Sequence, residues 1–177
     1  MVNTKPVGVA YSDPELVAGT TITGATVTGA TLDSTTKINS NIASGFALDQ
    51  QGATIATTSN SDAYVIVPVA GVMSLALFSG VDALTTSDTN YITFSITNLG
   101  QAGAGSTAML AATDANTTKA TGGTAIVANG RRTLTLNGTA ANLVVAAGDR
   151  LRIRAAATGT LANTVTFPAY TLVFTAA

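Results

Sequence analysis

From Ala63 onward the sequence is a succession of short runs rich in β-branched and aromatic residues. Turn signals built from Gly, Asn, Asp and Pro separate these runs roughly every 8–15 residues. The clearest run is residues 91–97, in which Ile92, Phe94 and Ile96 alternate with polar residues and would share one face of a strand. No helical stripe of apolar residues intervenes, and roughly eight strands fit in the available length. The sequence therefore predicts an all-β fold, a jelly-roll β-sandwich spanning residues 45–177.

The same alternation predicts which side chains fill the space between the sheets. We expect the following residues to be largely buried: Ile92, Phe94, Ile96, Leu134, Leu136, Leu151, Ile153, Val165, Leu172 and Phe174. Two Asn-Gly pairs, at residues 129–130 and 137–138, are typical of tight hairpin turns. The Gly-rich stretch Gly100–Gly105 lacks the Lys-Ser/Thr ending of a phosphate-binding loop, and we expect a loop or hairpin tip there.

Residues 1–44 follow a different pattern, in which Ile22, Val27 and Leu32 recur five residues apart within TITGATVTGATLDS. Five residues turn a helix by about 500°, a net rotation of about 140°, so no helix face collects them. In a strand, an odd spacing sends them to alternate faces. Three pentads cannot cover their own apolar side chains. We expect an extended N-terminal arm whose aliphatic residues contact other chains; the alternative is an ordered linker with accidental repetition.

Composition limits the chemistry that the chain can perform. The sequence has no histidine and no cysteine, so the commonest general base, the thiolate nucleophile and the commonest transition-metal ligands are missing. Its acidic residues are scattered, without the spacing of an EF-type calcium loop. We therefore expect no catalytic residue, no metal site and no cofactor, and no enzymatic activity.

Charge is also scarce, at 10% of residues with a net charge of −1. A weakly charged surface does little to keep copies of a protein apart, which favours self-association. Nucleic-acid binders usually carry a basic patch, so a nucleic-acid partner is not expected. No run reaches the roughly 18 apolar residues of a membrane span. The N-terminus has no apolar segment typical of a signal peptide, and we expect synthesis in the cytoplasm of the host cell.

One cluster of charge stands out, because Arg150, Arg152 and Arg154 alternate with Leu151 and Ile153. In a strand the three arginines lie on one face. One interpretation is a solvated strand face that also discourages pairing at a sheet edge. A second is an ion-pairing patch for a neighbouring subunit or an acidic partner surface. A third is contact with phosphate or nucleic acid.

Two segments carry a resemblance to a known class of proteins. Residues 67–98, VPVAGVMSLALFSGVDALTTSDTNYITFSITN, and residues 144–167, VVAAGDRLRIRAAATGTLANTVTF, resemble small phage virion proteins. These are head-fibre, capsid-decoration or cement proteins with jelly-roll domains that often form trimers. The resemblance covers roughly residues 63–174, and it implies no catalytic residue. The opening repeat is similar to stretches of phage fibre and tail proteins, in which three chains wind together or dock on the particle.

The resemblance implies a structural virion protein, a homotrimer on the capsid exterior that binds the major capsid protein and stabilises the shell. The arm would then either clasp the trimer or anchor it to the shell. The alternative function is a receptor-binding head or tail fibre tip that recognises a glycan on the host surface. Sugar sites often use aromatic side chains, and the low aromatic content of 5%, without tryptophan, weakens that alternative. A third alternative is an enzyme such as a depolymerase.

Overall fold

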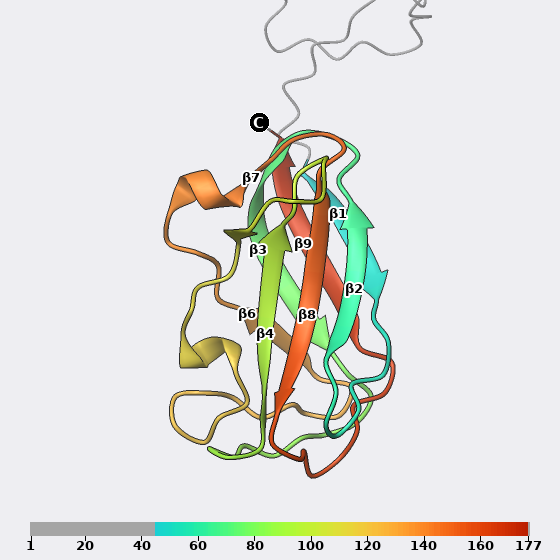
Figure 1. The fold of residues 1–177 in the computed structure, drawn as a ribbon, viewed down its shortest axis with the longest axis vertical. Coiled ribbons are helices and arrows are strands. Elements are labelled where there is room, and N and C mark those ends of the chain that lie inside the picture. The colour runs from blue at the N-terminus through green and yellow to red at the C-terminus, as the bar shows by residue number, and fades with distance from the viewer. Residues whose placement is uncertain (1–44, 177) are drawn as a thin grey trace, which may run out of the picture. The chain divides into compact units, whose positions relative to one another are not determined.

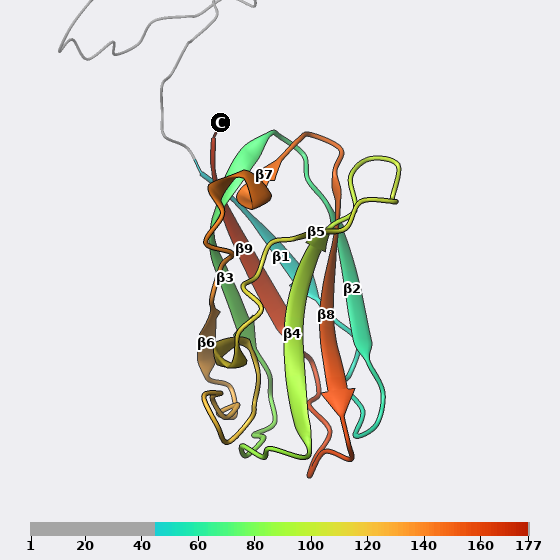
Figure 2. The same cartoon turned by 60° about the vertical axis from the view of Figure 1, so that its left-hand side comes forward.

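In the computed structural model, which describes residues 45–176, two antiparallel sheets face each other across a shared core (Figures 1 and 2). The described residues contain no α-helix, only two short 3₁₀ helices. The elements are β1 Phe46–Gln51, β2 Ser61–Ile66, β3 Gly71–Ser79, β4 Tyr91–Asn98, β5 Thr107–Ala108, η1 Asp114–Asn116, β6 Arg131–Leu134, η2 Ala140–Leu143, β7 Val144–Val145, β8 Arg150–Thr158 and β9 Ala169–Ala176. The predicted arm over residues 1–44 lies outside the described residues.

The order of the strands identifies the fold. One sheet runs β1-β9-β3-β6, with the short β7 beside the start of β3, and the other runs β2-β8-β4-β5. The pairs β1–β9, β2–β8, β3–β6 and β4–β5 are nested within one another along the chain, and all are antiparallel. This nesting of strands over two sheets is the jelly-roll arrangement. The predicted all-β jelly-roll sandwich is therefore confirmed for the described residues.

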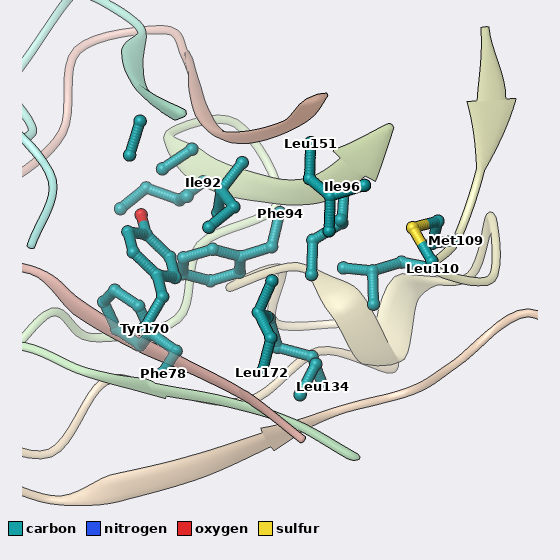
Figure 3. Close-up of a cluster of buried hydrophobic side chains, with 14 of the residues drawn as sticks. Phe78, Ile92, Phe94, Ile96, Met109, Leu110, Leu134, Leu151, Tyr170 and Leu172 are labelled. Atoms are coloured by element: carbon teal, nitrogen blue, oxygen red, sulfur yellow. The ribbon is translucent and has the colours of Figure 1, made fainter. Parts of the chain in front are cut away.

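The core lies where the alternating strands place their apolar side chains. Every residue of the predicted core is buried except Leu136, which is partly buried and packs against the others. Along β4, Ile92, Phe94 and Ile96 are buried while the residues between them are partly exposed, as the alternation predicted. The ring of Phe94 lies 4.6 Å from that of Phe78 on β3, so these two rings join the sheets at the centre (Figure 3).

Both ends of the described chain lie at one pole of the sandwich. Phe46 at the start of β1 is the register partner of Phe174 near the end of β9, and their rings stack with centroids 4.8 Å apart. The connections from β1 to β2, from β3 to β4 and from β8 to β9 lie at the opposite pole (Figure 1). The chain that precedes Gly45 therefore joins the sandwich at the pole where β9 ends.

The two predicted hairpins are wrong. Asn129-Gly130 makes a tight turn, with φ of 57° at Asn129, but the strand that follows, β6, pairs with β3. Asn137-Gly138 leads to η2 and not to a pairing strand. In a jelly roll most partners come from distant parts of the chain, so a tight turn need not join paired strands. The loop Gly100–Gly105 does close a hairpin, between β4 and β5, as expected.

We expect Phe94→Ala to lower the free energy of unfolding by about 3–5 kcal/mol, because Phe94 is buried between the two sheets and its truncation leaves a cavity there. Denaturant unfolding followed by circular dichroism measures this change. Ser95→Ala, on the outward face of the same strand, is the matched control and should stay within about 0.5 kcal/mol. A loss below about 1 kcal/mol for Phe94→Ala would contradict the packing described above.

Candidate functional site

The arginines predicted to share a face lie on the outer surface of the sheet β2-β8-β4-β5. Their strand, β8, alternates with Leu151 and Ile153 buried, so Arg150, Arg152 and Arg154 point away from the core. Strand β8 lies between β2 and β4, in the interior of the sheet. The interpretation that these arginines protect a sheet edge is therefore wrong, because their strand has no free edge.

Arg154 is held within the chain by an acidic neighbour on β2. Asp62 is the register partner of Arg154, and the guanidinium donates from Nε to Asp62 Oδ1 at 2.6 Å and from Nη2 to Oδ2 at 2.7 Å. These hydrogen bonds hold the pKa of the Asp62 carboxyl below its usual value and raise the pKa of Arg154. The charge of Arg154 is thus largely matched on the sheet surface.

Arg150 and Arg152 lack such a partner. The guanidinium carbon of Arg150 lies 4.2 Å from the centroid of the Tyr64 ring, a cation–π contact. Arg152 lies across the sheet between Tyr64 on β2 and Thr97 on β4. Its Nε is buried and makes no hydrogen bond, and within residues 45–176 neither arginine pairs with a carboxylate. The centre of this face therefore carries two arginines without an ion pair of their own, although the charge of Arg152 also helps to lower the pKa of Asp62.

An open groove of about 640 Å³ runs along β4 on the side away from β8, between β4 and the segment that follows β5. None of the three arginines lines it, but Thr97, which does, is the register partner of Arg152. The floor of the groove includes Thr93, Ser95 and Thr97, whose hydroxyls make no hydrogen bond within the part of the chain that the structure describes. Its wall is the segment that runs from β5 through η1 to Lys119. The lining residues are Tyr91, Thr93, Phe94, Ser95, Ile96, Thr97, Ala108, Leu110, Ala111, Ala112, Thr113, Asp114, Asn116, Thr117 and Lys119.

The groove wall is fixed by a buried amide. Asn116, at the end of η1, donates from Nδ2 to the carbonyls of Ala111 at 2.9 Å and Thr135 at 2.8 Å. Its Oδ1 accepts the backbone N–H of Thr135 at 2.7 Å. Thr118 adds a second anchor, because its Oγ1 accepts the backbone N–H of Ile92 on β4 at 2.8 Å. These bonds hold an irregular segment against the sheet where a regular strand would otherwise pair.

A buried arginine supports the same segment from beneath. Arg132 on β6 donates to three backbone carbonyls, of Thr124 at 2.8 Å, Ala115 at 2.8 Å and Thr117 at 2.6 Å. Its guanidinium carbon also lies 5.1 Å from the centroid of the Phe94 ring. Burial lowers the pKa of Arg132 from its usual value. Arg132 was not among the residues predicted from the sequence, although its alternation with Leu134 on β6 places it on the inward face.

One end of the groove carries a charged pair. Lys119 Nζ donates to Asp114 Oδ1 at 2.8 Å and lies 5.1 Å from the centroid of the Tyr91 ring. The hydrogen bond to Asp114 raises the pKa of Lys119. The groove therefore offers hydroxyls along its floor and an aromatic ring beside an ammonium at one end, with Arg152 on the strand next to β4.

The aliphatic residues of the pentads, Ile22, Val27 and Leu32, were predicted to contact other chains and lie outside the described residues. Within residues 45–176, no three Asp or Glu side chains gather in a way that would hold a metal ion. No helix in that range has the length and apolarity to cross a membrane.

Comparison of the chain with models of protein families, with curated proteins and with solved structures finds no match.

The lowered pKa values of three carboxyl groups predict how the stability of the fold depends on pH. Hydrogen bonds from Arg154 to Asp62, from Thr166 to Asp82 and from Thr121 to Asp88 hold each pKa below the usual 3.8. A depressed pKa in the folded state contributes stability that is complete above the unfolded pKa and is lost as pH falls through the folded pKa. We expect a constant unfolding temperature between about pH 7 and pH 5 and a decline below about pH 4.

Asp82→Asn should flatten part of that decline, because the amide does not titrate. Thermal unfolding of both proteins across this pH range is the measurement. Thr86→Val, a change at an exposed loop residue, is the control and should keep the wild-type profile. An unfolding temperature that falls equally in Asp82→Asn would contradict the assignment to Asp82.

Proposed function

We propose that this protein is a structural component of a phage particle, which decorates the capsid exterior as a homotrimer and cements neighbouring capsid subunits. The observation that carries the proposal is the position of Gly45, beside Phe174 at one pole of the jelly roll. If the residues before Gly45 bind a shell, the covalent connection at Gly45 would tether the sandwich to the shell through this pole. The resemblance of residues 63–174 to virion decoration proteins supports the same function.

Such a protein acts by binding and needs no chemical step. A ligand that binds an assembled state better than its separate parts stabilises that state by mass action. A decoration protein that contacts two neighbouring capsid subunits at once would therefore raise the free energy needed to separate them. The pentads fit this role, because Ile22, Val27 and Leu32 need apolar cover that three pentads cannot supply for themselves.

The outer face of the other sheet is suited to contact between subunits. Val173 on β9 lies between Ala47 on β1 and Leu75 on β3, and Leu77 follows two residues along β3. Charged side chains are sparse on this face, with Asp49 bonded to Thr171. A surface of small and aliphatic side chains supports a second copy of the chain as the occupant, since subunit interfaces are depleted of charge at their centres.

We expect sedimentation velocity at micromolar concentration to give a trimer. Leu77→Asp should shift the protein towards monomer, because it places a charge in the centre of the proposed contact. Thr86→Asp, in an exposed loop, is the control and should stay trimeric. A wild-type protein that sediments as a monomer would count against the trimer. A Leu77→Asp variant that remains a trimer would show that the subunits contact each other through a different surface.

Deletion of residues 1–34 tests the role of the arm. The truncated protein should keep its β-sheet circular dichroism, because the described core lies entirely within residues 45–176. It should bind undecorated capsids of the phage that carries the gene far more weakly than the full chain does, as measured by co-sedimentation. Unchanged binding together with an unchanged trimer would show that the arm is a passive linker.

A second candidate function is a receptor-binding fibre tip that recognises a glycan. The observation that favours it is the groove along β4, whose volume of about 640 Å³ falls in the usual range of ligand sites. Its floor of hydroxyl groups, with Tyr91 at one end, suits a polar ligand that can stack one face on a ring.

A further inference from the structure

We propose that the groove and Arg152 together form a binding site for an anionic saccharide, in which Arg152 pairs with the carboxylate or phosphate of the sugar. The inference rests on the second candidate function and specifies its ligand class. It is carried by two independent features of neighbouring strands, the guanidinium of Arg152 on β8, which makes no hydrogen bond to a described residue, and the groove along β4.

The first feature is the state of Arg152 compared with its neighbours. Arg154 is held by Asp62 and Arg150 stacks on Tyr64, but Arg152 has neither a carboxylate nor a ring contact among the described residues. Its Nε is buried without an acceptor. Within the described residues its Nη groups also make no hydrogen bond, and only Nε is sealed from solvent, so the Nη groups are the donors open to a ligand. A guanidinium binds the oxygens of a carboxylate or phosphate through paired hydrogen bonds, and its two Nη groups can supply such a pair.

The second feature is the row of hydroxyls in the groove. Thr93, Ser95 and Thr97 project from the same face of β4, about 6.8 Å apart along the strand. Thr97 is the direct register partner of Arg152, so the hydroxyl row ends at the residue opposite this arginine on the neighbouring strand. A chain of sugar residues lying along β4 would meet a hydroxyl at each step and an arginine at its end. This juxtaposition favours a ligand that carries many hydroxyls and a negative charge.

Other anionic ligands fit less well. A single-stranded nucleic acid needs a series of exposed stacking rings. Of the two aromatic residues that line the groove, Phe94 is buried in the core, so only Tyr91 is placed to stack on a base. An acidic protein surface would use the arginines without needing the hydroxyl row. The saccharide is the class that uses both features, and the acidic protein surface is one outcome of the test.

The experiment measures binding of the full-length protein to three immobilised polysaccharides by biolayer interferometry. Polygalacturonate supplies carboxylates, phosphomannan supplies phosphates, and dextran is neutral. We expect one or both acidic polymers to bind, with affinity that falls as salt is raised, and dextran to bind at least about tenfold more weakly. Arg152→Gln should reduce acidic binding by about tenfold or more, and Arg152→Lys, which keeps the charge but loses the paired donors, should fall between.

Thr97→Val distinguishes specific recognition by the groove from nonspecific attraction of an anion to the arginines. It removes one hydroxyl and leaves every charge in place. It should weaken acidic binding severalfold, whereas Arg131→Gln, an exposed arginine on the other sheet, should leave it unchanged. Thermal melts establish that each variant is folded. If both Arg152 variants fail to fold, the Thr97→Val result decides the assignment.

Each outcome bears on one of the two proposals. Equal binding of dextran and insensitivity to Arg152→Gln would overturn the anionic assignment while leaving a glycan receptor function intact. Absence of binding to all three polymers would overturn both. Dissociation of the trimer in folded Arg152→Gln would assign the arginine to a contact between subunits and overturn the ligand site.

Discussion

Each of the last two long strands, β8 and β9, lies between two earlier strands of its sheet, and the rest of the structure depends on this insertion. Strand β1 has β9 as its partner, and β2 has β8. Neither early strand can satisfy its backbone groups until the C-terminal residues arrive. The stacking of Phe46 on Phe174 and the contact of Phe78 with Tyr170 both require β9 in place. The core is therefore complete only when pairings across most of the chain have formed.

The same insertion determines how the arginines are presented. A strand at a sheet edge would let long side chains bend away into solvent on its free side. On β8, side chains from β2 and β4 flank each arginine, and they account for the ion pair with Asp62 and the stacking on Tyr64. Arg152 has Tyr64 on one side and Thr97 on the other, and this crowding buries its Nε without supplying an acceptor.

The sequence predicted what depends on local periodicity and failed where structure depends on distant partners. Ile92, Phe94 and Ile96 were predicted because alternation is a property of the strand itself. The Asn-Gly turns were misassigned because a turn does not reveal which strand pairs with the next. Buried residues in irregular segments, such as Leu84 and Ile126, have no period to reveal them. Arg132 was missed because a charged residue is expected to face solvent. In the structure it points inward, where three backbone carbonyls accept its hydrogen bonds.

The groove follows from how little of β4 is covered by its neighbour. Strand β5 has two residues and pairs with Thr97 and Asn98, so the chain beyond it lies beside β4 without a regular ladder. Backbone groups there still need partners, and Asn116 and Arg132 supply them from side chains. Buried polar bonds of this kind are costly to break, so they hold the irregular wall in one conformation. A wall held in this way keeps the groove open before any ligand arrives, and a preformed site avoids the ordering cost that weakens binding to flexible surfaces.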